Sequence, residues 1–119
     1  MMAPAAEMGA RAEVANMPES APGQGGLEAH VVLERLATIP DWTLDDGKLR
    51  RSYAFANFVA AVRFVDRLTR VAEAQQHHPD VCIQWGRVTL HLWSQDVGGI
   101  TARDFRLASA IEALVASED

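Results

Sequence analysis

One long helical pattern stands between two pairs of strand patterns, and this order constrains the fold more than any other feature of the sequence. After Asn57, a favourable helix N-cap, apolar residues recur at steps of three and four over about five turns. They are Phe58, Val62, Val65, Leu68 and Ala72. Because Pro79 disfavours helical geometry at the residue before it, we expect the helix to end near His77.

Alternating apolar residues on either side of this helix predict two β-hairpins. The first hairpin has its turn at residues 45–47, and its strands carry Trp42, Leu44, Leu49, Tyr53 and Phe55. The second has its turn at residues 86–87, and its strands carry Val81, Ile83, Trp85, Val88, Leu90 and Leu92.

A shorter helix is expected at each end of this arrangement. The first runs from about Leu27 and stops at Pro40, and the last opens at Thr101 and shows one apolar stripe. The order α-β-β-α-β-β-α predicts an α+β fold, a two-layer sandwich in which a four-stranded antiparallel sheet carries three helices on one face. We expect this domain to span residues 27–119. Residues 1–26, rich in Ala, Pro and Gly, are expected to form a disordered N-terminal tail.

Composition narrows the possible partners. The net charge of -5 argues against direct binding to nucleic acid or to an anionic membrane, which are held mainly by clustered Lys and Arg. No apolar run approaches the roughly 18 residues that cross a bilayer, and no secretory signal is recognised, so we expect a cytoplasmic protein. The only cysteine, Cys82, excludes an internal disulfide and a cysteine-rich zinc site. We expect it to be a buried packing residue.

Glu73, His77 and His78 are the residues best suited to acid and base chemistry. Glu73 and His77 are four positions apart, so their side chains share a face and touch if the helix lasts that far. His78, held extended by Pro79, points in another direction. Two imidazoles in different environments can serve as acid and base.

Each of these residues also has a purely structural interpretation. Adjacent histidines at a helix end commonly cap carbonyl groups, and Glu73 could reach solvent from the edge of the apolar stripe. A metal site is less favoured, because a catalytic metal takes about three protein ligands and no third His or Cys falls at a familiar spacing. Asp104 forms a capping box with Thr101 at the start of the last helix, where free amides can also meet a ligand.

These residues belong to a longer pattern that resembles the signature of the pterin-4a-carbinolamine dehydratases. The pattern reads Glu73-x-x-x-His77-His78-Pro79-Asp80, then Trp85, then Ser94-x-Asp96-x-Gly98-Gly99-x-Thr101-x-x-Asp104. Upstream, the matching residues are Trp42, Tyr53, Phe55, Phe58, Ala61 and Phe64. The resemblance covers about residues 27–116.

The resemblance implies dehydration of 4a-hydroxytetrahydropterins to quinonoid dihydropterins, a step that recycles the pterin cofactor of aromatic amino acid hydroxylases. It also implies a homodimer or homotetramer, and neither a cofactor nor a metal. Carried over to this sequence, His77, His78 and Asp104 would be catalytic. The residues that would bind the pterin are Glu73, His77, His78, Pro79, Ser94 and Gln95.

Gln95 departs from the family pattern, which usually places a third histidine at this position. Glutamine can hydrogen-bond a pterin but cannot shuttle protons. If this position supplies the acid or base, its loss costs roughly 10² to 10⁴ in rate. The alternative function is a non-enzymatic one, in which the dehydratase fold acts as a binding or assembly protein or as a coactivator, as in some relatives.

Overall fold

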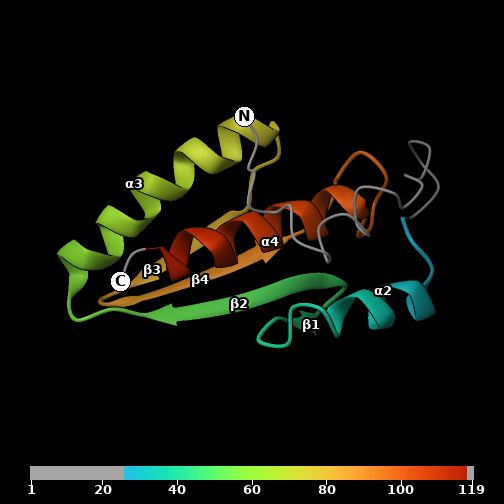
Figure 1. Cartoon of the computed structure of the whole chain (residues 1–119), viewed down its shortest axis with the longest axis horizontal. Helices are drawn as coiled ribbons and strands as arrows, with labels where there is room; N and C mark the ends of the chain where they lie inside the picture. Colours follow the sequence, from blue (N-terminus) through green and yellow to red (C-terminus); the bar gives the residue numbers. More distant parts are fainter. Residues whose placement is uncertain (1–25, 118–119) are drawn as a thin grey trace.

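The computed structural model describes residues 26–117, which form a four-stranded antiparallel sheet and three helices (Figure 1). The helices are α2 (Ala29–Leu36), α3 (Phe58–Gln75) and α4 (Ala102–Ala116), and the strands are β1 (Thr43–Asp45), β2 (Lys48–Ala54), β3 (Asp80–Gln84) and β4 (Arg87–Leu92). The strand order is β1-β2-β4-β3. The predicted α+β fold is therefore confirmed. The predicted tail lies outside the described residues, apart from Gly26.

The core lies between one face of the sheet and helices α3 and α4. From the sheet it contains the buried residues Leu49, Tyr53, Val88, Leu90 and Leu92. From α4 it contains Phe105, Leu107, Ala108 and Ile111, and from α3 it contains Ala61, Phe64 and Leu68. Full burial of each large aliphatic or aromatic side chain stabilises the fold by about 1.5–3 kcal/mol, so burial is the main force that holds the helices on the sheet.

The predicted buried face of α3 is confirmed at Leu68 and Ala72 but is wrong at Phe58 and Val62. Ala61, Phe64, Leu68 and Ala72 point into the core, whereas Phe58 and Val62 are 57% and 40% exposed. The predicted N-cap is confirmed, because the Asn57 side chain accepts a hydrogen bond from the Ala60 amide. Two apolar series run along the first turns of this helix, one through Phe58 and Val62 and the other through Ala61 and Phe64. Periodicity alone favoured the first series. As a result α3 presents apolar side chains to solvent.

The two hairpin turns use left-handed backbone conformations. In the first turn Asp46 and Gly47 have φ of 55° and 75°, as a two-residue hairpin loop requires. The second turn consists of Trp85 and Gly86 instead of the predicted residues 86–87, and Trp85 has φ of 55° and is 88% exposed. A side chain at Gly86 would lie 2.6 Å from the Phe55 carbonyl oxygen, which explains the glycine there.

Cys82 was expected to be a buried packing residue, but it lies at the surface. It lies in β3, an edge strand, on the face of the sheet away from the helices, where it is exposed. The alternation of β3 is the reason, because Val81 and Ile83 take the face that the helices cover.

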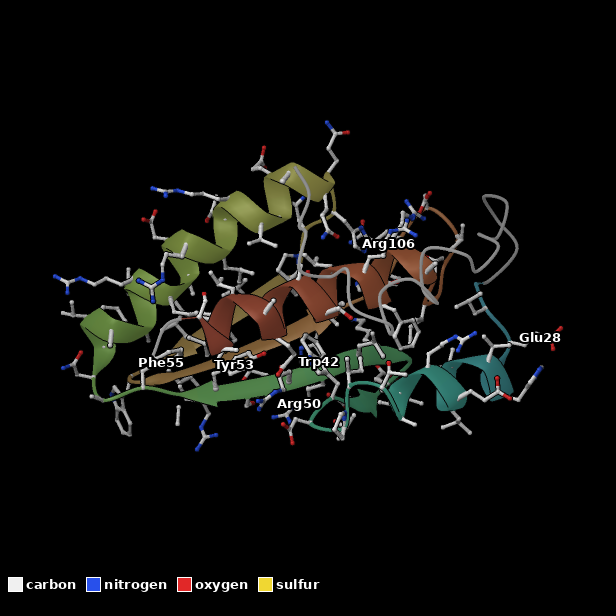
Figure 2. The ribbon with its side chains drawn as sticks, in the orientation of Figure 1. Glu28, Trp42, Arg50, Tyr53, Phe55 and Arg106 are labelled. Carbon is white, nitrogen blue, oxygen red and sulfur yellow. The ribbon has the colours of Figure 1, made fainter. Side chains whose placement is uncertain are left out.

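Glu112 ties α4 to the rest of the domain. A single carboxylate oxygen, Oε2, accepts hydrogen bonds from Trp42 Nε1 at 2.9 Å, from Arg51 Nε at 3.0 Å, and from the Tyr53 hydroxyl. Trp42 and Tyr53 lie between β2 and α4 in Figure 2. Burial, and then the hydrogen bond to the Glu112 carboxylate, raise the pKa of Tyr53 above its usual value, so this donor keeps its proton.

Replacing Glu112 by alanine is therefore expected to lower the free energy of unfolding by about 2–3 kcal/mol, because the buried donors lose their shared acceptor. Denaturant titration of the full chain measures this change. Glu34→Ala, which removes an exposed glutamate from α2, is the matched control and should change stability by less than about 0.5 kcal/mol. Equal effects of the two substitutions would contradict the proposed role of Glu112.

Candidate active site

His77 and Asp104 form a buried pair where the end of α3 meets the start of α4. Helix α3 ends at Gln75, and Gln76 is a left-handed C-cap with φ of 51°. This cap turns the chain so that His77 points inward, where it is only 9% exposed. Its Nε2 atom lies 2.5 Å from Asp104 Oδ1, and Asp104 itself is fully buried.

The second oxygen of Asp104 is also occupied. Oδ2 accepts hydrogen bonds from the Ser94 hydroxyl and from the Thr101 amide, each at 2.9 Å. The second of these bonds belongs to the capping box of α4, which the sequence predicted and the structure confirms. A buried carboxylate is costly unless donors compensate it, and here both oxygens have donors. Asp104 therefore holds the ring of His77, and its complete burial keeps it out of reach of a ligand.

His78 pairs with Glu73 in a more open position. His78 Nε2 lies 2.6 Å from Glu73 Oε2, and the two side chains are 61% and 68% exposed. The expected contact between Glu73 and His77 is wrong, because the left-handed cap at Gln76 turns His77 toward Asp104 and brings His78 to Glu73. Both rings meet a carboxylate through Nε2. Within residues 26–117 no hydrogen bond occupies either Nδ1 atom, so both are open to a ligand.

The segment that joins β4 to α4 forms another part of the site. The Ser94 side chain is 1% exposed and bonded to Asp104, so its hydroxyl faces the interior. Gln95 is exposed, and its side chain makes no hydrogen bond with the described residues. Pro79 is partly exposed beside the histidines. The sequence placed Ser94 and Gln95 together as ligand residues, but the structure separates them into a buried support and an exposed side chain.

An ion pair that the sequence did not predict lies beside this segment. Arg103 donates from Nη2 to Asp96 Oδ1 at 2.7 Å. This hydrogen bond lowers the pKa of Asp96, and the positive charge of the same guanidinium lowers it further. The chain between Asp96 and Arg103 contains Gly98 in a left-handed conformation. Apolar periodicity does not predict how such an irregular segment folds, so it could not predict this ion pair. The only available signal was the opposite charge of the two residues.

Across residues 26–117, no group of three or more His, Cys, Asp or Glu side chains is arranged to hold a metal ion. In the same residues, no helix combines the length and the apolar character needed to cross a membrane.

His91 lies on the sheet face away from the core, and its Nε2 atom lies 2.9 Å from Asp45 Oδ2.

Comparison with known proteins identifies the family. Residues 26–114 match the family model described as "Pterin 4 alpha carbinolamine dehydratase". A protein of Chloroflexus aurantiacus is 44% identical over 84 residues, 71% of this chain and 90% of the relative, and one of Acidobacterium capsulatum is 44% identical over 89 residues, 75% and 97% of the two chains. Both are named "Putative pterin-4-alpha-carbinolamine dehydratase". The chain therefore belongs to the pterin 4 alpha carbinolamine dehydratase family.

A solved structure supports the same assignment. The crystal structure of a "transcriptional coactivator/pterin dehydratase" from Brucella melitensis is similar to this chain with a TM-score of 0.70 and 27% identity. The similarity covers 76% of this chain and 98% of the Brucella chain. The α+β sandwich is thus the fold of a solved member of the same class.

The role of Asp104 can be tested through the tautomer of His77. In Asp104→Asn, the Thr101 amide and the Ser94 hydroxyl still require an acceptor, so the new amide nitrogen should face His77. The neutral ring should then carry its proton on Nδ1 in place of Nε2. Long-range ¹⁵N–¹H NMR spectra at alkaline pH report the tautomer. Asp96→Asn, which alters a carboxylate that makes no hydrogen bond to His77, should leave the tautomer unchanged.

Proposed function

We propose that this protein dehydrates a 4a-hydroxytetrahydropterin to a quinonoid dihydropterin and so takes part in pterin cofactor recycling. The observation that carries the proposal is a pair of neighbouring histidines, each bonded through Nε2 to its own carboxylate and each with an open Nδ1 atom, in a member of this family. The names of the relatives point to the same reaction.

The reaction needs two proton transfers. The bond between C4a and the hydroxyl oxygen breaks, the leaving hydroxyl takes a proton and departs as water, and N5 loses its proton as the C4a–N5 double bond forms. One imidazole donates the first proton and the other accepts the second, through the Nδ1 atoms that face away from the carboxylates. Water then restores both rings. Such positioned acid and base groups each contribute about 10² to 10⁴ in rate.

Asp104 has a positioning role in this scheme. It bonds to His77, Ser94 and Thr101 and is fully buried, so it fixes the ring of His77 and does not contact the pterin. Glu73 holds His78 in the same way from the exposed side. We propose that Pro79 and Gln95 border the bound pterin, and that the Gln95 amide hydrogen-bonds the ring without moving protons.

Activity is measured by following ultraviolet absorbance as chemically generated 4a-hydroxytetrahydropterin dehydrates with and without the protein. The wild-type protein should accelerate the spontaneous reaction, and the double substitution of His77 and His78 by alanine should abolish this acceleration. His30→Ala, which removes an exposed histidine of α2, should leave it intact. A wild-type protein without effect would overturn the proposed function, and an active double variant would overturn the site.

Gln95→His should raise turnover in the same assay if proton transfer is rate-limiting, because it restores an imidazole at an exposed position of the 94–99 segment. The gain should appear in kcat and not in KM, since glutamine already supplies the hydrogen bond that helps to hold the ring. An unchanged kcat would show that His77 and His78 perform both transfers unaided.

A second candidate function on the same fold is protein assembly, beginning with assembly of this chain with copies of itself. The Brucella structure bears the name of a transcriptional coactivator, and here α3 exposes Phe58, Val59 and Val62 on its outer side. We propose that this surface is covered when the chain forms a homodimer or homotetramer in the cytoplasm, where hydroxylases that use pterins would be pathway partners. Light scattering of the full chain should show an oligomer that Val62→Lys weakens, and a wild-type monomer would refute this.

A further inference from the structure

A cavity lies at the opposite end of α3 from the histidines. It has a volume of about 550 Å³ and lies where the end of β2, the start of α3 and the end of α4 meet. Figure 2 shows Phe55 at this end of the molecule, at the passage from β2 to α3. Since α3 rises about 1.5 Å per residue over its length, the cavity is well separated from the His77–Asp104 pair.

One wall of this cavity is apolar. The partly exposed ring of Phe55 forms this wall, and it packs against the fully buried ring of Phe64 with the centroids 5.0 Å apart. Ala60 and Val115 complete this side from α3 and α4. Sites of about 300–1,000 Å³ lined by aromatic and small apolar groups commonly bury a small organic ligand.

The other side of the cavity is positive. Arg63 and Arg67 lie one turn apart on α3 and both line the cavity. Across residues 26–117 no acidic side chain is within ion-pair distance of Arg63. The first turn of α3 contains no acidic residue, so the positive end of its helix dipole is not neutralised within the helix. The cavity therefore combines an apolar wall with groups that attract an anion.

We propose that this cavity binds a small carboxylate that has an aromatic or branched aliphatic body. The body packs on Phe55, Ala60 and Val115, and the carboxylate takes hydrogen bonds from the guanidinium of Arg63. A neutral ligand of the same shape lacks these charge-assisted bonds. An inorganic anion lacks the apolar contact. This site is independent of the proposed dehydration and stands or falls separately from it.

The proposal is tested on the full chain by ¹⁵N–¹H NMR titration with 3-phenylpropionate, 3-phenylpropionamide and inorganic phosphate. The carboxylate should cause saturable shifts at the amides of Ala60, Arg63 and Val115. The neutral amide and phosphate should each bind at least about tenfold more weakly, because each lacks one half of the recognition. Shifts of equal strength with the neutral amide or with phosphate, or shifts confined to the His77 region, would overturn the proposal.

Variants place the ligand in the cavity. Arg63→Ala should weaken binding of 3-phenylpropionate about tenfold, and Ala60→Leu, which fills the cavity without changing charge, should weaken it as well. Arg70→Ala removes the same charge from the same helix at an exposed position that does not line the cavity, and should leave binding unchanged. Equal loss in Arg63→Ala and Arg70→Ala would show a general charge effect and refute the site.

The sequence of the chain provides one competing occupant. Glu118 and Asp119 follow Val115 closely and carry the negative charge that the cavity attracts. Binding of 3-phenylpropionate that appears only after Glu118→Gln and Asp119→Asn would mean that the chain's own acidic residues fill the cavity, and would overturn the proposal. Equal binding before and after these substitutions supports it.

Discussion

The buried carboxylate of Asp104 is the interaction on which both the fold and the site depend. It is fully buried and accepts hydrogen bonds from His77, from Ser94 and from the Thr101 amide. The burial of a charge costs several kcal/mol unless donors surround it, so these three donors must be in place together. A single side chain thus joins the end of α3, the segment after β4 and the start of α4. The residue that caps a helix is also the residue that orients a histidine.

Helix α4 is held by polar contacts at both ends, and this makes it a rigid support for the site. At its start Asp104 bonds to the loop and to His77, and about two turns later Glu112 bonds to Trp42, Arg51 and Tyr53. Between them, Phe105 and Ile111 pack against the sheet. Sliding or rotation of α4 would break buried hydrogen bonds at both ends. The position of His77 is therefore set by the whole domain and not by its own loop.

The order of elements could be predicted from the sequence because each element carries a local signal. The period of two in the hairpins, the Asn57 cap and the Thr101–Asp104 capping box are all read within a few residues, and all are confirmed. The apolar stripe of α3 was predicted correctly at Leu68 and Ala72 and wrongly in the first turns, where Phe58 and Val62 are exposed. Which residues of the helix are buried there depends on its neighbours. Ala61 and Phe64 are buried because the core between α3 and α4 accommodates them.

The pairing within the site could not be predicted for a related reason. The exchange of partners, in which His77 takes Asp104 and His78 takes Glu73, follows from the left-handed conformation of Gln76. Glycine or asparagine commonly marks such a cap, whereas glutamine gives no signal. The family resemblance named the participating residues, but the spacing of Glu73 and His77 suggested a contact that the backbone prevents.

The two histidine pairs differ in one physical respect that bears on the chemistry, namely their access to water. His78 and Glu73 are mostly exposed, so this ring exchanges protons with solvent directly. His77 is nearly buried and held by a buried carboxylate, so water reaches little of its ring. The proposed roles of the two rings as acid and base call for different surroundings, and their difference in access to water provides one. In the proposed dehydration both transfers fall to these two rings, because Gln95 cannot relay a proton, and the position that Asp104 gives to His77 would then help to set the rate.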